Sequence, residues 1–356
     1  MNRNATPYSQ LKIFRHQDIL NNLIEGKRCK PVYIRIKPTN KCNHNCSYCH
    51  YRNAYLDLDE YNPADEIPHD RMMEIISDMA EIGVRAVTFS GGGEPLLYPY
   101  IEEAMEKILD AGIDLSIITN GSMLKGRRAE LLAKAKWVRI SVESMDDATY
   151  CKIRGIREHS FDDLCANIES FAKMKQDNCE LGINVVVGAD NYHEIWRIAE
   201  LMKGLGVNHV KFAPLITNDT WGYHASFKER VISDLHMMEE KLNDRNFKVI
   251  DLYTGDFADS VIFERQYHKC FRKDFSCVIA ANSKVYLCQD KAYLSDSVVC
   301  DLSQESFKEG WQSERVTDMF REFDAVKMCR QHCVYDSRNE LIGAFLDMDL
   351  NHVNFV

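Results

Sequence analysis

The sequence predicts an α/β fold, in which helices cover a parallel β-sheet and a smaller cysteine-rich α+β region follows. The first observation is that strand-like and helix-like segments alternate six times by about residue 215. Such alternation is typical of an open parallel sheet or of a full or partial barrel. The second is a change after about residue 255 to short strands, clustered cysteines and one or two helices. We therefore expect a helical lead-in at 1–30, a core at 31–255 and a C-terminal unit at 256–356.

The individual elements follow from local pattern. Short runs rich in β-branched residues predict strands, beginning with "PVYIRIKP"; the six are expected at 31–38, 85–90, 114–120, 137–143, 181–188 and 209–215. Apolar residues at helical spacing predict the helices between them, which are expected at 69–83, 100–112, 125–136, 160–177 and 191–206. Gly83 should end the first of these helices, and Ser160 is suited to cap the fourth.

The composition restricts the class of function. The chain has 356 residues, 45% hydrophobic and 28% charged, as expected of a soluble globular protein, and its net charge of -10 argues against a nucleic-acid partner. The N-terminal "MNRNATPYSQLKIF" lacks the apolar segment of a secretion signal, and no run of about 18 apolar residues indicates a membrane span. Thirteen cysteines without such a signal favour metal ligation or catalysis in a reducing cytoplasm over disulfides.

A cysteine triad follows the first predicted strand. "TNKCNHNCSYCHY" places Cys42, Cys46 and Cys49 in the spacing C-x3-C-x2-C. The loop lies at the carboxyl end of a strand, where sites are found in parallel α/β folds. Four cysteines would complete a cubane iron–sulfur cluster or a zinc tetrahedron, whereas three leave one iron of a cubane open for chemistry. The alternative is a zinc site in which His44 or His50 supplies the fourth ligand.

A glycine-rich segment follows the second predicted strand. In "FSGGGEPLL", glycines would let the backbone approach a ligand, and the carboxylate of Glu94 can accept hydrogen bonds from an ammonium group. An ordinary glycine-rich turn is the alternative. The segment comes one strand–helix unit after the cysteines, so both loops should share one rim of the sheet.

The two motifs together, with Tyr48 before the last cysteine, resemble the radical S-adenosylmethionine superfamily. The resemblance implies a partial (β/α)6 barrel. It also implies that the three cysteines hold a [4Fe-4S] cluster whose open iron binds the amino and carboxylate groups of S-adenosylmethionine. Gly92, Gly93 and Glu94 match the segment that binds the methionine amino group.

The resemblance also implies an activity. In this superfamily an electron from the cluster cleaves the S–C5′ bond of S-adenosylmethionine, and the resulting 5′-deoxyadenosyl radical abstracts hydrogen from a substrate. The protein orients the reactants and excludes water and oxygen, because the cofactor supplies the difficult chemistry. A reductant such as flavodoxin or ferredoxin would be a partner.

Further candidates lie at the ends of the third and fourth strands. Related enzymes place cosubstrate contacts there, which makes Asn120, Ser141 and Glu143 candidates in "ITNGS" and "VRISVES". Asn120 is equally suited to simple turn chemistry. Ser141 would face the site if the alternating residues Val138, Ile140 and Val142 face the helices.

The segment "YCKIRGI" resembles one in which an arginine reaches the cosubstrate carboxylate. Arg154 is the corresponding residue here. The alternative is an arginine in a surface salt bridge.

The C-terminal cysteines resemble an extension called SPASM, or Twitch in its shorter form, with the pattern C-x(9–15)-G-x4-C. "CFRKDFSCVIAANSKVYLC" fits this pattern from Cys270 to Cys288, with Ser283 where glycine is usual. Its halves "SCVIAA" and "KVYLC" alternate in polarity around "NS" and therefore predict a hairpin. "CDLSQESFKEGWQSE" resembles the next stretch, with Cys300 at another usual glycine.

"CRQHC" supplies Cys329 and Cys333, which completes a set of four with Cys270 and Cys288. The resemblance implies that these four cysteines hold one auxiliary [4Fe-4S] cluster. A zinc site with the same four ligands is the alternative.

Six cysteines remain outside both sets. We expect them to be small buried apolar residues; they are Cys29, Cys151, Cys165, Cys179, Cys277 and Cys300. Cys277 could instead replace an auxiliary ligand. One of the six could donate a hydrogen atom to a substrate radical, as cysteines do in radical epimerases.

The substrate is inferred from the size of the chain. Radical enzymes with an auxiliary cluster act on small hydroxylated molecules or mature ribosomal peptides, and peptide-maturing members often begin with a leader-binding domain. Only about 30 residues precede the first strand, so we expect a sugar, aminoglycoside or nucleotide-sugar-like substrate that undergoes dehydrogenation, epimerisation or dehydration. "PLITNDTWGYHASFKER", after the sixth strand, could line its pocket or be an ordinary loop. The alternatives are a peptide maturase and a non-catalytic iron–sulfur or zinc protein.

Overall fold

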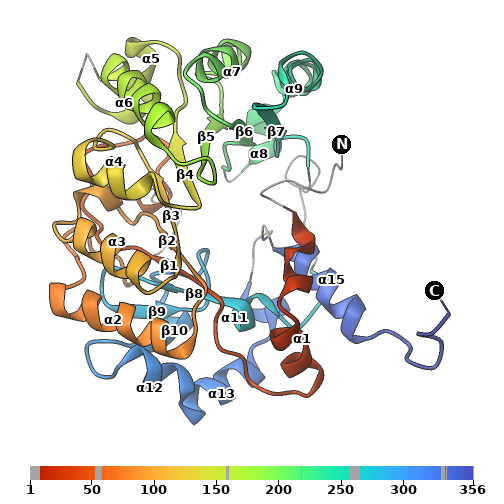
Figure 1. The fold of residues 1–356 in the computed structure, drawn as a ribbon. Coiled ribbons are helices and arrows are strands. Elements are labelled where there is room, and N and C mark those ends of the chain that lie inside the picture. Colours follow the sequence, from red (N-terminus) through yellow and green to blue (C-terminus); the bar gives the residue numbers. More distant parts are fainter. Residues whose placement is uncertain are drawn as a thin grey trace.

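The computed structural model describes residues 9–52, 58–157, 160–217, 219–255, 265–329, 333 and 335–355. Its centre is a ten-stranded sheet with the order β10-β9-β8-β1-β2-β3-β4-β5-β6-β7, which stays open between its two edge strands (Figure 1). The predicted α/β class is therefore confirmed.

Seven strands of this sheet run parallel from β1 to β7. They are β1 Tyr33–Ile36, β2 Ala86–Phe89, β3 Asp114–Thr119, β4 Trp137–Ser141, β5 Glu180–Val187, β6 His209–Pro214 and β7 Lys248–Asp251. The six predicted strands are all present. The seventh, β7, was not predicted, because its sequence KVID has a charged residue at each end and gives no apolar run.

The helices of the core lie along one side of the sheet (Figure 1). They are α2 His69–Ile82, α3 Ile101–Asp110, α4 Gly126–Leu132, α5 Asp147–Arg154, α6 Phe161–Met174, α7 Ile195–Gly204 and α9 Lys228–Leu242. The five predicted helices are confirmed with shorter ends, whereas α5 and α9 were not predicted. Gly83 ends α2 with a φ of 88°. Ser160 occupies the N-cap of α6, but its side chain does not cap the helix; Asp147 Oδ1 accepts the N–H of Ser160 and Phe161 instead.

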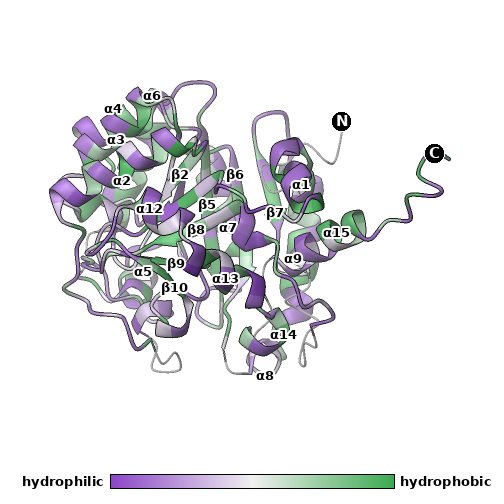
Figure 2. Ribbon diagram, turned by 90° about the horizontal axis from the view of Figure 1, so that it is seen from below, coloured by the Kyte–Doolittle hydropathy of each residue, from purple (hydrophilic) through white to green (hydrophobic). Residues whose placement is uncertain are grey.

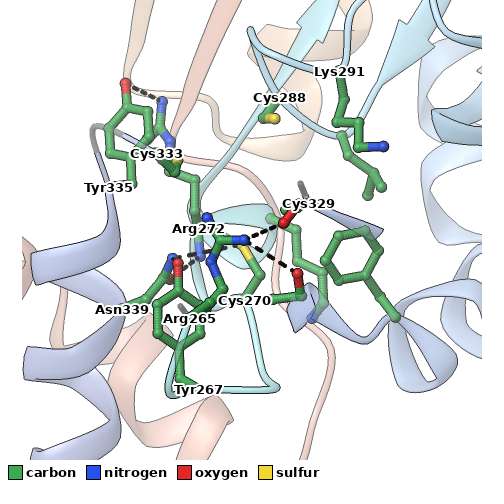
Figure 3. A pocket seen from close by; sticks show the side chains of 14 residues that line it. Arg265, Tyr267, Cys270, Arg272, Cys288, Lys291, Cys329, Cys333, Tyr335 and Asn339 are labelled. Carbon is green, nitrogen blue, oxygen red and sulfur yellow. Dashed lines mark hydrogen bonds between the residues drawn. The ribbon is translucent and has the colours of Figure 1, made fainter. Parts of the chain in front are cut away.

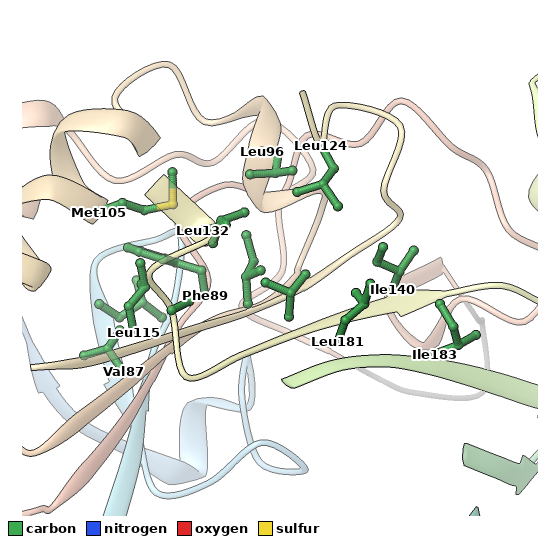
Figure 4. Packing of buried hydrophobic residues seen from close by; sticks show 14 of the residues in the cluster. Val87, Phe89, Leu96, Met105, Leu115, Leu124, Leu132, Ile140, Leu181 and Ile183 are labelled. Atoms are coloured by element: carbon green, nitrogen blue, oxygen red, sulfur yellow. The ribbon is translucent and has the colours of Figure 1, made fainter. Parts of the chain in front are cut away.

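The main core lies between this sheet face and the helices. Alternate residues of each strand, such as Val87, Leu115, Ile140 and Ile183, pack there with at most 1% exposure (Figure 4). Val138, Ile140 and Val142 belong to the same cluster, which confirms the predicted alternation in β4. The helices show one hydrophobic and one hydrophilic side, as this packing requires (Figure 2).

The C-terminal region extends the same sheet. β8 Ser276–Ile279 pairs parallel with β1, and β9 Lys284–Tyr286 and β10 Val298–Asp301 follow in antiparallel order. The predicted hairpin between β8 and β9 is confirmed, and Ser283 supplies the left-handed residue of its turn with a φ of 58°. The predicted domain boundary at 255/256 adjoins residues 256–264, which lie outside the described part of the chain. The boundary therefore stays a prediction.

Short helices surround this framework. They are η1 Gln10–Arg15, α1 Gln17–Ile24, η2 His50–Arg52, η3 Pro95–Leu97, α8 Thr220–His224, α11 Arg272–Phe275, η4 Ser295–Ser297, α12 Phe307–Gln312, α13 Glu314–Glu322, α14 Ala325–Met328 and α15 Asp336–Leu346. Helices α1 and α15 share a second hydrophobic cluster through Ile19, Leu20 and Ile342. Among the described residues, no helix has both the length and the apolar character to cross a membrane.

Candidate active site and auxiliary cysteine pocket

The triad Cys42, Cys46 and Cys49 lies in the loop between β1 and η2, and each residue is half-buried. The C-terminal end of α5 supports this loop. The backbone N–H of Asn45 donates to the carbonyl of Arg154 at 2.8 Å, and a Cβ at Gly155 would lie 2.4 Å from the Asn45 carbonyl oxygen. Gly155 also has a φ of 61°, so the residue type is fixed both by this contact and by the backbone.

The glycine-rich loop after β2 lies directly against the cysteine loop. The N–H of Gly93 donates to Thr39 and that of Glu94 donates to Lys41, both at 2.9 Å. A Cβ at Gly92 would lie 1.7 Å from Asn40 Oδ1. We expected these glycines to admit a ligand; the structure shows that contact between the two loops already requires the glycine at this position.

Glu94 joins the glycine-rich loop to the end of β3. Its carboxylate is 3% exposed and accepts hydrogen bonds from Thr119 Oγ1 at 2.6 Å, Asn120 N at 2.7 Å and Leu96 N at 3.0 Å. Burial raises the pKa of Glu94, although the bonds from Asn120 and Thr119 act in the opposite direction. Its role in binding the methionine amino group stays a prediction, as do those of Gly92 and Gly93.

Asn120 connects the end of β3 to the cysteine loop. Its Nδ2 donates to Asn43 Oδ1 at 2.8 Å, and its Oδ1 accepts the backbone N–H of Ser122 at 3.0 Å. The second contact is the turn chemistry that we considered, and the first places Asn120 beside the cysteines. Both hydrogen bonds leave the predicted cosubstrate contact untested.

Arg154 and Glu143 form a buried ion pair behind the cysteine loop, with exposures of 3% and 1%. Arg154 Nη2 also donates to the carbonyl of Ser141, and Nη1 donates to the sulfur of Cys46 at 3.6 Å. Burial lowers the pKa of Arg154, but Glu143 and then Tyr48 raise it, and the net shift is strongly upward. Arg154 is therefore a permanently charged part of the site and not a surface salt bridge.

Two rings lie around this ion pair. The Arg154 guanidinium lies 5.8 Å from the ring of Tyr48 and 5.7 Å from that of Tyr150. His44 packs edge-on against Tyr150, and burial together with Arg154 lowers the pKa of His44 to about 4. His44 is therefore neutral near pH 7.

The four C-terminal cysteines line one pocket (Figure 3). They come from separate segments. Cys270 precedes α11, Cys288 follows β9, Cys329 ends α14, and Cys333 lies just before α15. The structure thus brings together residues that are as many as 63 positions apart, and four thiols around one pocket fit an iron–sulfur cluster.

Helix α15 organises this pocket. Asp336 accepts hydrogen bonds from Arg265 Nε at 3.0 Å, from the Tyr267 hydroxyl and from the N–H of Cys333 at 2.7 Å. Asn339 donates to the sulfur of Cys270 at 3.7 Å. We predicted no role for Asp336 or Asn339, because their positions on α15 carry no motif.

A polar chain links the two cysteine sets. Lys37 and Gln289 both donate to the hydroxyl of Tyr51, which lies two residues beyond Cys49. Gln289 is adjacent to Cys288. Lys37 is fully buried, and burial followed by the charge of Arg35 lowers its pKa well below the usual value. Lys37 directly follows the first strand, which was the only sequence signal for its position, and we had assigned it no role.

Five of the other six cysteines are buried as expected, and Cys165 is not. Cys29, Cys151, Cys179, Cys277 and Cys300 are buried and Cys165 is half-buried. Cys277 belongs to the main core and is not among the residues lining the pocket, so its placement does not favour it as an auxiliary ligand. Among the described residues, no three histidine, cysteine, aspartate or glutamate side chains are grouped to hold a single metal ion.

The segment after β6 forms α8 and the start of α9. His224 there is buried, with its ring nitrogens at 2.8 Å from the Tyr253 hydroxyl and 3.0 Å from the Leu215 carbonyl. These contacts are internal, and the predicted role of residues 214–230 in lining a substrate pocket stays a prediction.

Sequence relatives agree with this geometry. The chain is 30% identical over 186 residues to a probable GTP 3',8-cyclase of Methanothermobacter thermautotrophicus, a match covering 51% of this chain and 58% of that protein. It is 31% identical over 156 residues to an S-adenosylmethionine-dependent nucleotide dehydratase of Lacinutrix mariniflava, covering 43% of this chain and 32% of the relative. The chain therefore spans less than two thirds of the length of these relatives.

Solved structures and family models complete the comparison. SuiB of Streptococcus suis, bound to its precursor peptide SuiA, has a similar fold, with a TM-score of 0.64, 17% identity and coverage of 91% of this chain and 76% of SuiB. An iron–sulfur cluster-binding domain, SPASM, matches residues 270–334. The radical SAM superfamily model matches residues 36–229, which is more than half of the chain. This chain therefore belongs to the radical S-adenosylmethionine superfamily, with a [4Fe-4S] cluster and S-adenosylmethionine as cofactors and a SPASM domain for an auxiliary iron–sulfur cluster.

Proposed function

We propose that this enzyme acts on a small polar substrate, a sugar or nucleotide-sugar-like molecule, by dehydrogenation, epimerisation or dehydration. The observation that carries the proposal is the polar sheet face below the cysteine rim. Thr88, Ser116 and Asn184 lie on the face of β2, β3 and β5 that is turned away from the helices. Thr88 and Ser116 are buried and already hydrogen-bond to each other at 2.7 Å, whereas Asn184 is half-buried and is the group on this face with which a hydroxylated substrate could pair.

The names of relatives support a polar substrate. GTP 3',8-cyclase and nucleotide dehydratase are names of enzymes that act on nucleotides, which combine a sugar with charged groups. We extend only the substrate class from these relatives to this chain.

The residues of this chain have separable roles in the proposed activity. Cys42, Cys46 and Cys49 would hold the cluster, which together with S-adenosylmethionine supplies the 5′-deoxyadenosyl radical that abstracts hydrogen from the substrate. Arg154 supports the loop through its contacts with Cys46 and Glu143. Because this ion pair is buried, it holds the loop in position without competing water.

The auxiliary pocket would hold its cluster through Cys270, Cys288, Cys329 and Cys333. Four thiolates leave no open iron for a substrate, so we assign this pocket a role in electron transfer. A flavodoxin or ferredoxin is the proposed external reductant. Thirteen free cysteines favour a reducing cytoplasm as the location.

A ribosomal peptide is the second candidate substrate, favoured by the similarity of the fold to SuiB. At 17% identity this similarity concerns the fold and not the substrate. The polar sheet face favours the small molecule. A product with a new thioether or carbon–carbon bond within a peptide would show that the substrate is a peptide.

Anaerobic reconstitution with iron and sulfide, followed by addition of S-adenosylmethionine and a strong reductant, tests the proposal. We expect 5′-deoxyadenosine to form, and to form faster with the right sugar or nucleotide sugar. In deuterated water, oxidation would place no solvent deuterium at the attacked carbon, whereas epimerisation through an exchangeable thiol would. Iron-containing protein that never yields 5′-deoxyadenosine would contradict the proposal.

A further inference from the structure

The wall of the auxiliary pocket is positively charged. Among the described residues that line it there is no carboxylate, and there are four cations beside the cysteines, namely Arg265, Arg272, Lys273 and Lys291. Carboxylates from outside the wall pair with three of them: Asp336 with Arg265, Asp274 with Lys273, and Asp296 with Lys291. Arg272 forms no ion pair with a described carboxylate, so its charge is not offset in this way.

Two tyrosine rings hold the guanidinium of Arg272. Its central carbon lies 3.9 Å from the centre of the Tyr335 ring and 5.6 Å from that of the Tyr33 ring. Nη2 donates to the Tyr335 hydroxyl at 3.1 Å (Figure 3). The Nε–H of Arg272 is buried and has no hydrogen-bond partner among the described residues. A buried donor of this kind in a native site calls for an acceptor.

The backbone of Arg272 is tied to helix α15. Asn339 Oδ1 accepts the N–H of Phe271 at 2.9 Å and that of Arg272 at 3.1 Å. These two bonds fix the Asn339 amide, and its Nδ2 therefore donates towards the sulfur of Cys270 at 3.7 Å. The side chain of Arg272 thus starts from a fixed point two residues beyond a cysteine ligand.

An iron–sulfur cluster held by four thiolates gains one negative charge when it is reduced. Its reduction potential depends on the surrounding charge and on hydrogen bonds to its sulfur atoms. A nearby cation and an N–H donor both stabilise the more negative, reduced form and raise the potential. The carboxylate of Asp290, which lies 3.7 Å from the sulfur of Cys333, acts in the opposite direction.

We propose that Arg272 raises the reduction potential of the auxiliary cluster, through its uncompensated charge and through the Nε–H that lacks a partner. The pocket fits such a cluster in this respect, because sulfur supplies the acceptor that the buried donor requires. Arg272 touches no substrate in this proposal. It acts through the cluster, by making it a better electron acceptor.

Together with the proposed function, on which this step rests, a raised potential favours dehydrogenation. Hydrogen abstraction from the C–H of a secondary alcohol leaves a substrate radical centred on carbon. This radical gives its electron to the auxiliary cluster and its O–H proton to water, and a carbonyl group forms. The electron returns to the external reductant, which supplied one electron for the cleavage of S-adenosylmethionine, so the electrons balance.

The test is a redox titration of the reconstituted holoenzyme, followed through the EPR signals of the reduced clusters. S-adenosylhomocysteine carries the same amino and carboxylate groups as S-adenosylmethionine, so it alters only the signal of the cluster with an open iron; the other signal is the auxiliary one. In Arg272→Gln and Arg272→Met we expect the equilibrium constant for reduction of the auxiliary cluster to fall about ten-fold. For one electron this is a shift of about 59 mV towards negative potential. Arg272→Lys, which keeps the charge, should shift it less.

Arg338 provides the matched control. Its guanidinium also lies over the Tyr335 ring, at 5.1 Å, but it is not among the described residues that line the pocket. Arg338→Gln should therefore move the potential less than Arg272→Gln does. Iron analysis of each variant should give about eight irons, as in the wild-type enzyme.

Three results would overturn the inference. One is an unchanged potential in Arg272→Gln, and another is an equal shift in Arg272→Gln and Arg338→Gln. The third is loss of auxiliary iron from both neutral Arg272 variants, which would show that Arg272 holds the pocket together and does not tune it.

The outcome also distinguishes this inference from the proposed function. The same wild-type preparation is assayed for 5′-deoxyadenosine with sugars and nucleotide sugars. An active enzyme whose potential ignores Arg272 overturns the inference and leaves the proposed function standing. A potential that depends on Arg272, in an enzyme that never forms 5′-deoxyadenosine, contradicts the proposed function instead.

Discussion

The rim loop and the auxiliary pocket present their cysteines in opposite ways. The rim set comes from eight consecutive positions on one loop, whereas the auxiliary set comes from four segments held together by tertiary contacts. Each set nevertheless depends on one helix from elsewhere, α5 for the rim and α15 for the pocket. A local motif can therefore specify the ligands of a site while a distant helix fixes their arrangement.

The largest expected effect tests whether the two sets are independent. Replacing Cys42, Cys46 and Cys49 together with alanine should abolish 5′-deoxyadenosine formation. About eight irons in the wild-type enzyme should fall to about four if both clusters are cubanes. Iron analysis and product assay on the same preparations measure this. A variant that still cleaves S-adenosylmethionine would show that the rim assignment is wrong, and zinc without iron in the variant would contradict the auxiliary cluster.

The second prediction concerns the helix that supports the auxiliary pocket. Asp336→Ala removes the partner of buried Arg265 and of the Cys333 N–H. Breaking a buried pair in this way costs about 3–5 kcal/mol, and we expect loss of about half of the iron. Denaturant unfolding and iron analysis measure both effects. Asp347→Ala, an exposed change at the end of the same helix, is the control. Full iron content in Asp336→Ala would show that α15 does not organise the pocket.

The third prediction asks the same question of the rim. Arg154→Met leaves Glu143 buried without its partner, and we expect a loss of about 3–5 kcal/mol in the free energy of unfolding. The double variant Arg154→Met/Glu143→Gln should recover much of this loss, because no buried charge remains. Lys152 lies on the same helix as Arg154 and forms an exposed ion pair with Asp190. Lys152→Met should leave the free energy of unfolding unchanged.

The rate of 5′-deoxyadenosine formation gives the second readout for the rim. It should fall in Arg154→Met and stay low in the double variant, because the contact of Arg154 with Cys46 is absent in both. Recovery of both stability and rate in the double variant would show that Arg154 only neutralises Glu143.

The same contrast explains how far the sequence could be interpreted. Six strands followed from alternation, and the rim cysteines from a compact motif. Strand β7 was missed because KVID has a charged residue at each end and gives no apolar run. The strands "YIRIK", "WVRIS" and "HVKFA" did show a cation on the face away from the core.

The supports of both cysteine sets were invisible for a related reason. Asp336 and Asn339 contact cysteines through distances fixed only when α15 packs, and Lys37 meets Tyr51 only because β1 and the cysteine loop fold back on each other. Arg154 could be predicted because its segment resembles one found in the family. Ligands with local spacing could thus be predicted, while residues that act across elements needed the fold.

The smallest expected effect concerns glycine, which the two regions use differently. In the rim, a Cβ at Gly92 would lie 1.7 Å from Asn40 Oδ1, so the absence of a side chain is a steric requirement. In the auxiliary hairpin, Ser283 adopts a φ of 58° where the sequence pattern favours glycine. A left-handed serine costs roughly 1 kcal/mol in backbone strain. Glycine avoids this strain but loses more conformational entropy on folding, so the net gain in stability is smaller. Ser283→Gly should therefore raise the free energy of unfolding by about 0.5 kcal/mol.

Thermal unfolding of the reconstituted enzyme, with Gly92→Ser and Asn282→Gly in parallel, measures this difference. Gly92→Ser should lower the midpoint strongly, because the two loops of the rim must separate to admit a Cβ. Asn282→Gly should lower it modestly, since the 2.8 Å hydrogen bond from Asn282 to the Tyr286 hydroxyl is lost and no positive φ is relieved. Only Ser283→Gly should raise the midpoint, by about a degree. A fall in that variant would mean that the serine side chain stabilises the turn by more than its backbone costs, and the hairpin would then be as constrained by its residue type as the rim.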